Sequence, residues 1–105
     1  MKQVFDVVYS AEAKQDLFAI YRYLVDVKLA PDTAKHLVRH IRGAIHSLQD
    51  MPERFVIVDW EPWQSLELHR MPVDNYVVFY LVDKKLKLVT VVRIFYGGRN
   101  ISEIM

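Results

Sequence analysis

The sequence predicts an α+β fold, in which an N-terminal strand and an antiparallel hairpin of two helices precede a mostly antiparallel sheet. Two observations lead to this prediction. Apolar residues recur at helical spacing between residues 11 and 51, and three strand-like runs rich in Val, Tyr, Phe and Ile follow at 65–71, 76–82 and 86–96. The breaks between these runs are too short for a crossover connection, so the three strands form an antiparallel meander.

The first half of the chain reads as a strand followed by two helices. Residues 4–10 alternate imperfectly and are expected to form the strand, and Ser10 then offers an N-cap oxygen. Pro31 suits the first position of the second helix, and the short link before it makes the two helices antiparallel. The apolar stripes are Ala13, Leu17, Ile20, Tyr21 and Leu24 on the first helix, and Ala34, Leu37, Val38, Ile41, Ala44, Ile45 and Leu48 on the second.

The segment between the helices and the meander is apolar but broken by charges and proline. Met51 to Arg54 ends the second helix, and residues 55–64 are expected to form a loop with a short edge strand at 55–58. Trp60 and Trp63 are expected to lie over the rim of the core.

Composition limits the classes of function. A chain of 105 residues is expected to be one domain spanning 1–105, and a net charge of +1 gives no whole-domain field toward nucleic acid, so we expect no sequence-specific DNA binding by this chain alone. Zero cysteines exclude disulfides and thiolate sites. No apolar run approaches the roughly 20 residues of a membrane span, and the charged start MKQVFD is unlike a signal peptide. We therefore expect a cytoplasmic protein with no membrane partner.

A trial register, set by closing both turns of the meander tightly, divides the strands into two faces. The face predicted to pack on the helices holds Leu66, Leu68, Arg70, Tyr76, Val78, Tyr80, Leu88, Thr90, Val92 and Ile94. The opposite face holds Glu67, His69, Val77, Phe79, Leu81, Lys87, Val89, Val91, Arg93 and Phe95. Because this second set mixes large apolar groups with charges, we expect it to be covered by a protein partner.

Several motifs together resemble one family. The helical half reads D-L-x-x-I-x-x-Y-L, a break with Pro, an Ala in the next turn and a final L-x-x-x-P, and the strand half reads R-x-x-P-x-x-x-Y-x-x-x-Y and R-I-x-Y-G-x-R. This order of motifs is similar to that in the ParE and RelE toxins of bacterial type II toxin–antitoxin modules. The helical residues of the pattern are Asp16, Leu17, Ile20, Tyr23, Leu24, Pro31, Ala34, Leu48 and Pro52. The resemblance covers almost the whole chain and implies the fold reached from periodicity.

The resemblance implies one of two activities. RelE-like toxins cleave messenger RNA on the ribosome, which needs cations and a proton carrier. They typically have an arginine where this chain has Val77, basic residues where it has Leu66 to Leu68, and often a tyrosine near the C-terminus, where it has Ile104 and Met105. ParE-like toxins inhibit DNA gyrase by binding, so these departures favour a ParE-like toxin. The alternatives are a ribosome-dependent endoribonuclease and a non-toxic dimerising relative.

The predicted sites follow from this hypothesis. We expect a cognate antitoxin to bind Val77, Phe79, Val89, Val91 and Phe95, and the target, DNA gyrase, to bind Arg93, Tyr96 and Arg99. If the chain instead acts with the ribosome on messenger RNA, then His69, Arg93 and Arg99 are the candidate catalytic residues; otherwise no catalytic residue, cofactor or metal is expected. As structural roles, His69 is predicted to be a partly buried neighbour of Glu67 or Arg93, and Arg70 to pair with a helix carboxylate such as Asp16. His36 and His40 have metal-ligand spacing on the second helix but no third ligand, so both are expected to be exposed to solvent.

Overall fold

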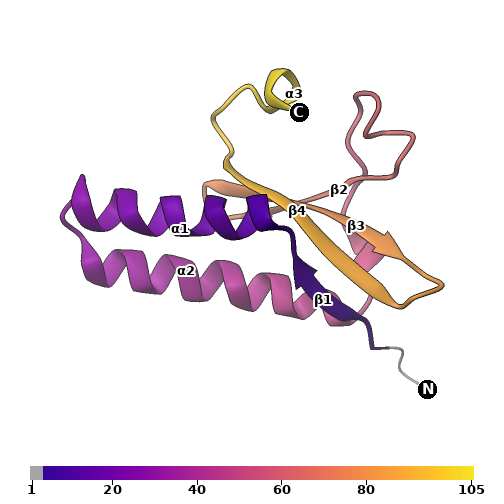
Figure 1. Cartoon of the computed structure of the whole chain (residues 1–105), viewed down its shortest axis with the longest axis horizontal. Helices are drawn as coiled ribbons and strands as arrows, with labels where there is room; N and C mark the ends of the chain where they lie inside the picture. Colours follow the sequence, from indigo (N-terminus) through magenta and orange to yellow (C-terminus); the bar gives the residue numbers. More distant parts are fainter. Residues whose placement is uncertain (1–3) are drawn as a thin grey trace.

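A computed structural model describes residues 4–105, so the first three residues of the MKQVFD start lie outside the described part. The predicted fold class is confirmed (Figure 1). The elements are β1 (Asp6–Tyr9), α1 (Ala11–Asp26), α2 (Pro31–His46), β2 (His69–Val73), β3 (Tyr76–Asp83), β4 (Leu88–Tyr96) and α3 (Ile101–Ile104), with short 3-10 turns at Ser47–Gln49 and Pro52–Arg54. Among the described residues, no helix is long and apolar enough to cross a membrane.

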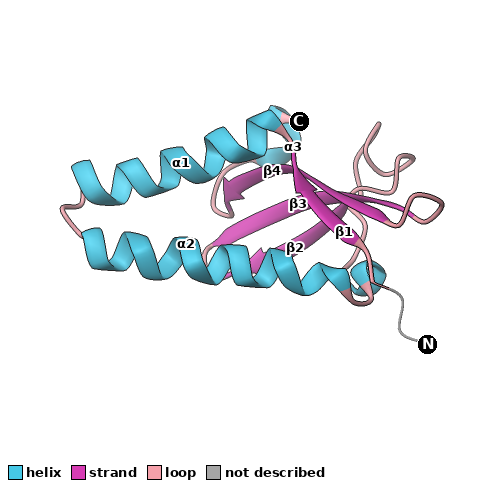
Figure 2. Cartoon of the chain, turned by 60° about the horizontal axis from the view of Figure 1, so that its bottom comes forward, coloured by secondary structure: helices cyan, strands magenta, loops and turns pink. Residues whose placement is uncertain are grey.

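The sheet has the strand order β1-β4-β3-β2, in which β1 runs parallel to β4 and the other neighbours are antiparallel. The predicted meander is therefore β2, β3 and β4. Figure 2 shows α1 and α2 side by side on one face of this sheet, and the turn between them extends past the end of the strands. The loop before β2 and the C-terminal α3 lie on the other side (Figure 1).

Local chemistry sets the ends of the helices as predicted. The Ser10 Oγ accepts a hydrogen bond from the Ala13 N–H at 2.9 Å and donates one to the Val92 carbonyl at 2.7 Å. This one hydroxyl therefore caps α1 and ties it to β4. Pro31 occupies the first turn of α2, where its missing N–H removes no hydrogen bond.

Two apolar cores lie on the two faces of the sheet. The hairpin core contains Phe5, Ala13, Ile41, Ile45, Leu48, Met71, Val73, Val78, Tyr80, Val89, Val91 and Ile94, with Leu17, Ile20, Leu37 and Ala44 packed against it. The second core contains Val58, Leu68, Val77, Phe79, Phe95 and Ile101, with Trp60, Trp63, Leu81, Val92 and Met105 around it. Both predicted stripes thus contribute to the hairpin core, and both tryptophans pack on the second core.

The trial register is wrong for β2, because the predicted strand ends at residue 71 and so leaves Pro72 in the turn. Pro72 instead pairs with Val77 inside the strand, and a two-residue turn of Asp74 and Asn75 follows, with Asp74 at φ 54°. Since β2 is an edge strand, it tolerates a proline that lacks an N–H. Its register therefore shifts by one residue, so His69 pairs with Tyr80 and faces the hairpin core, while Arg70 faces the other side.

The trial register is also wrong for the first half of β4, because a bulge interrupts the β3–β4 pairing. Phe79 pairs with Arg93 and Tyr80 with Val91, which leaves Val92 without an opposite residue. A bulge of this kind exchanges the faces of the residues before it. Val89 and Val91 consequently point into the hairpin core, while Phe95, beyond the bulge, stays on the second face.

The segment before β2 is mostly irregular. In place of the predicted edge strand at 55–58 there is one isolated bridge between Ile57 and His69, supported by a hydrogen bond from the Val58 N–H to the Leu68 carbonyl at 2.9 Å. Residues 61–67, which include the start of the predicted 65–71 strand, form turns. Glu67, at φ 60°, precedes the point where the extended backbone begins.

Candidate functional site

Arg93, a predicted target-binding residue, pairs with the first helix. Its Nε and NH2 groups donate to the two carboxylate oxygens of Asp16 at 2.7 and 3.0 Å, and the Ile94 N–H donates to Asp16 at 3.0 Å. The sequence predicted Arg70 as the partner of Asp16, but the partner is Arg93. Arg70 cannot reach Asp16 because it faces away from the helices. Asp16 also satisfies a backbone N–H on the edge of β4 beyond the end of β1. The hydrogen bonds to the Asp16 carboxylate raise the pKa of Arg93, which keeps the guanidinium charged.

At the end of β4, the two arginines of the predicted target site pack on Phe95, whereas Tyr96 packs on Tyr76. The guanidinium carbons of Arg93 and Arg99 lie 4.4 and 5.3 Å from the centre of its ring. Tyr96 is half exposed and meets the Tyr76 ring edge-on at 5.8 Å between ring centres. The structure therefore brings Arg93, Tyr96 and Arg99 to one end of β4, as a surface of two cations and one exposed aromatic ring.

Gly98 fixes the position of the Tyr96 ring. A Cβ atom at residue 98 would lie 2.5 Å from a ring carbon of Tyr96, so any side chain there displaces the ring or the backbone. Gly98, which occupies the x position of the Y-G-x-R pattern, thus permits a close approach between residues 96 and 98.

A groove of about 690 Å³ runs between α1 and the end of β4, beside the Arg93–Asp16 pair. Its apolar wall includes Ala19, Ile20 and Ile94, and Tyr23, Tyr76, Tyr96, Lys28 and Arg99 stand around it. Beyond Val91 the outer edge of β4 has no strand partner among the described residues. The sequence had not predicted Tyr23 or Lys28 here, although Tyr23 belongs to the D-L-x-x-I-x-x-Y-L motif.

His69 lies apart from the arginines with which it was grouped. It is 4% exposed, its Nδ1 lies 2.8 Å from the Phe55 carbonyl oxygen, and its ring stacks on Tyr80 at 5.1 Å. It faces the hairpin core, whereas Arg93 pairs with Asp16 at the edge of β4 and Arg99 follows β4. The predicted neighbours Glu67 and Arg93 are replaced by Phe55 and Tyr80, and the structure does not assemble the cluster of His69, Arg93 and Arg99.

The five residues predicted to bind the antitoxin are buried within this chain. Val89 and Val91 are 0% exposed beneath the helices. Val77, Phe79 and Phe95 do share the second face, but each is 4% exposed or less, because the loop before β2 and the C-terminal segment cover them. The expectation of an open apolar face was therefore wrong, and the residues of this chain close it.

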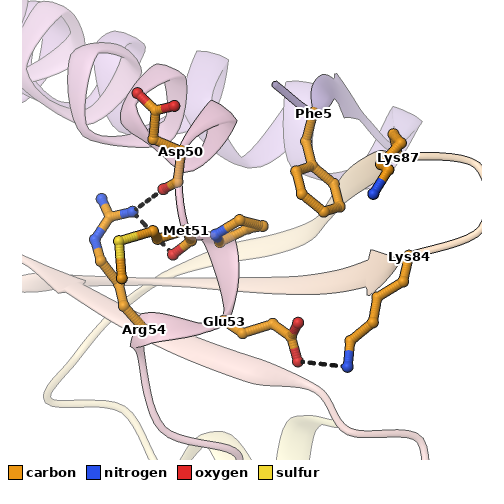
Figure 3. Close-up of a pocket in the computed structure, with 8 residues that line it drawn as sticks. Phe5, Asp50, Met51, Glu53, Arg54, Lys84 and Lys87 are labelled. Carbon is orange, nitrogen blue, oxygen red and sulfur yellow. Dashed lines mark hydrogen bonds and ion pairs between the residues drawn. The ribbon is translucent and has the colours of Figure 1, made fainter. Parts of the chain in front are cut away.

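Another pocket lies away from the end of β4, beside the β3–β4 turn. A pocket of about 970 Å³ is bounded by the turn after α2 and by the β3–β4 turn (Figure 3). Its charged groups already have partners: Glu53 pairs with Lys84 at 3.3 Å, and the Arg54 guanidinium donates to the Asp50 carbonyl at 2.6 Å. The Lys87 ammonium lies 5.4 Å from the centre of the Phe5 ring. These contacts stabilise the turns that form the pocket.

Buried and paired polar groups elsewhere serve the fold. Tyr80 is fully buried and donates its hydroxyl to the Pro52 carbonyl at 2.5 Å, and burial raises its pKa to about 12. His40 lies 2.7 Å from an Asp74 carboxylate oxygen. Within residues 4–105, no three His, Cys, Asp or Glu side chains gather as a metal site would require.

The comparison with protein families decides the classification. The sequence profile described as the ParE toxin of the type II toxin–antitoxin system parDE matches residues 7–101. This chain belongs to the ParE toxin family. None of the curated proteins gives a significant sequence match.

Solved structures of similar fold come from toxin–antitoxin complexes. The chromosomal ParDE system of Pseudomonas aeruginosa contains a chain with a TM-score of 0.72 and 21% identity, and the match covers 90% of this ParE-family chain and 97% of that one. The archaeal RelE–RelB complex of Pyrococcus horikoshii gives 0.63 and 20%, covering 91% and 98%. The RelBE2 complex of Mycobacterium tuberculosis gives 0.62 and 18%, covering 91% and 94%. These likenesses establish the RelE/ParE fold.

Proposed function

We propose that this ParE-family chain is the toxin of a type II toxin–antitoxin module, that it inhibits DNA gyrase by binding, and that a cognate antitoxin neutralises it. The observation that supports binding over RNA cleavage is the filling of the second face. Val77 stands where RelE-like toxins typically carry an arginine, and it is 4% exposed between Phe79 and Phe95. Cleavage needs a proton carrier beside the scissile phosphate, and His69 is buried on the opposite face. The proposed site of action is the cytoplasm.

The proposed target-binding surface is the end of β4. Arg99 and Tyr96 are exposed there, and Arg93 is held in place by two hydrogen bonds to Asp16. Arginine and tyrosine are enriched among the residues that dominate binding energy at protein interfaces. Inhibition by binding requires such a fixed surface and no acid–base pair.

The proposed antitoxin site is the groove between α1 and β4, in place of the buried face predicted from the sequence. Its apolar wall suits the side chains of an extended or helical segment. Contact through side chains is favoured because Ser10 and Asp16 already bond to the Val92 carbonyl and the Ile94 N–H on the outer edge of β4. An antitoxin bound there also covers Tyr96 and Arg99, because both residues line this groove. Neutralisation then follows from occupation of the same end of the molecule.

Two assays with the purified chain test the target. We expect it to inhibit DNA supercoiling by gyrase, and to leave messages intact in a translating ribosome extract. Cleaved messages with unaffected gyrase would support the endoribonuclease instead. No response in either assay, together with harmless expression in a bacterial host, would support a non-toxic relative.

A substitution in the groove tests the antitoxin site. Ala19 is exposed on α1 and lines the groove, so Ala19→Trp fills it without disturbing a core, and we expect at least tenfold weaker binding of the antitoxin. Gln15→Trp, also exposed on α1, is the matched control. Equal antitoxin affinity for both variants would exclude the groove.

A further inference from the structure

A small pocket of about 310 Å³ lies on the second face of the sheet, where the chain leaves β4. Four parts of the sequence meet there: the loop before β2, β2 itself, β3, and the segment between β4 and the C-terminus. The polar residues that line it are Asp59, Trp60, Arg70, Arg99, Asn100 and Ser102. The pocket is separate from the groove between α1 and β4, although Arg99 borders both.

Arg70 and Arg99 bring to this pocket two cations that form no ion pair within 4.0 Å among the described residues. Within the described part of the chain, no carboxylate oxygen lies within 4.0 Å of either guanidinium. Arg93, by contrast, donates two hydrogen bonds to the Asp16 carboxylate. The contact of Arg99 with the Phe95 ring, at 5.3 Å, orients the guanidinium but leaves its N–H donors in the plane of the group unfilled.

Trp60 shows that the same region has unused hydrogen-bonding capacity. Its indole Nε1 is the one buried side-chain nitrogen or oxygen in residues 4–105 that has no hydrogen-bond partner. The neighbouring Trp63 is satisfied, because its Nε1 donates to the Met105 carbonyl at 3.0 Å. The two indoles therefore differ. Trp63 has an acceptor within the chain, whereas Trp60 borders the pocket and its buried Nε1 has no acceptor.

Charge and size select the ligand. Asp59 offsets one arginine, so the lining carries a formal charge of +1, which matches one carboxylate better than a doubly charged phosphate group. Planar guanidinium groups bind carboxylates through paired hydrogen bonds. A space of about 310 Å³ is at the small end of ligand pockets and suits one side chain.

We propose that this pocket binds the carboxylate of an aspartate or glutamate on a protein partner, held by Arg70 and Arg99. That the partner is a protein rests on the proposed function, whereas the binding of a carboxylate does not. The pocket therefore predicts that the protein recognised by the end of β4 carries an acidic anchor residue.

Proton–nitrogen correlation spectra of the isotope-labelled chain test this proposal with an internal control. The probe is a capped Gly-Glu-Gly peptide, its Gly-Gln-Gly counterpart is the matched control, and inorganic phosphate is titrated separately, all at constant ionic strength. We expect the glutamate peptide to shift the Trp60 indole resonance saturably, to leave the Trp63 indole in place, and to bind at least tenfold more tightly than the glutamine peptide. An unmoved Trp60 resonance, equal response to both peptides, or tighter binding of phosphate would overturn the proposal.

Variants locate the two cations. Arg70 and Arg99 are exposed, so Arg70→Gln and Arg99→Gln keep the fold, and we expect each to weaken the glutamate peptide about tenfold. Arg22→Gln, an exposed site that pairs with Asp26 on α1, is the control and should bind as the parent does. Undiminished binding by both pocket variants would contradict the assignment. If the chain binds the glutamate peptide but does not inhibit gyrase, the carboxylate pocket is supported and the proposed function is contradicted.

Discussion

The two faces of the sheet are both buried, but they are covered in different ways. Two 16-residue helices, α1 and α2, cover the hairpin core, and hydrogen bonds within each helix satisfy its own backbone. The second core is covered by the irregular loop before β2 and by the four-residue α3. Since the loop is mostly turns, its position depends on side chains such as Trp60, Trp63 and Ile101. The cover of the hairpin face is therefore held by regular backbone hydrogen bonds, and the cover of the second face depends more on side-chain packing.

The largest difference between the faces is expected for a buried charge. Val91→Asp places a carboxylate at a fully buried position of the hairpin core, which costs several kcal/mol and should unfold the chain. Thr90→Asp, at a half-buried neighbouring position on the same strand, should remain folded. Circular dichroism and urea unfolding distinguish the two, and a folded Val91→Asp protein would contradict the assigned faces.

Matched truncations measure how firmly each cover is packed. Ile41→Ala in the hairpin core should lower the free energy of unfolding by about 3 kcal/mol, because a fully buried site between helix and sheet cannot collapse. Ile101→Ala in the second core should cost about 1 to 2 kcal/mol, because the short C-terminal segment can relax into the space. Urea unfolding of both variants gives the comparison, and equal losses would show that the two covers are equally rigid.

The Arg93–Asp16 pair joins the hairpin to the end of β4. Asp16→Asn removes the charge that accepts three hydrogen bonds, and we expect a loss of about 2 kcal/mol in the free energy of unfolding. Arg22 and Asp26 form an exposed pair on α1, so Asp26→Asn is the control and should cost at most about 0.5 kcal/mol. A double-mutant cycle of Asp16→Asn with Arg93→Met that gives no coupling energy would show that the pair does not stabilise the fold.

The smallest effect at pH 7 concerns Tyr80, and it depends on pH. Burial raises its pKa from 10 in the unfolded chain to about 12, so the folded state binds the hydroxyl proton more tightly. This contribution is complete below pH 10 and is lost as the pH rises toward 12, by at most about 2 to 3 kcal/mol. Tyr80→Phe should cost about 1 kcal/mol at pH 7 and flatten the decline between pH 10 and 12. An unchanged slope in urea unfolding across that range would contradict the assignment.

The sequence predicted the elements better than their registers. Helical periodicity, the cap at Ser10 and the proline at residue 31 are local signals, and all three are confirmed. The faces of the strands depended on whether Pro72 lay in the turn and on an unmarked bulge at Val92, and neither follows from period-2 alternation. As a result, the trial register placed both Val89 and Val91 on the wrong face of the sheet.

The target-binding role of Arg93, Tyr96 and Arg99 remains a prediction. The C-terminal motif placed them near one another because they lie within seven residues of one strand and its turn. The partners of these residues come from far along the chain, as Asp16 shows, and single-sequence patterns do not identify such pairs. Trp60 was predicted to cap a core, but its unpaired N–H depends on the tertiary structure.

A titration of gyrase with the purified chain tests the central claim most directly. A toxin that acts by binding should inhibit supercoiling in proportion to the fraction of gyrase occupied, reaching its limit near stoichiometric amounts when gyrase is well above the dissociation constant. Arg99→Gln should shift that curve to higher concentration. Full supercoiling at a large excess of toxin, with cleavage of ribosome-bound message at catalytic amounts, would contradict the account.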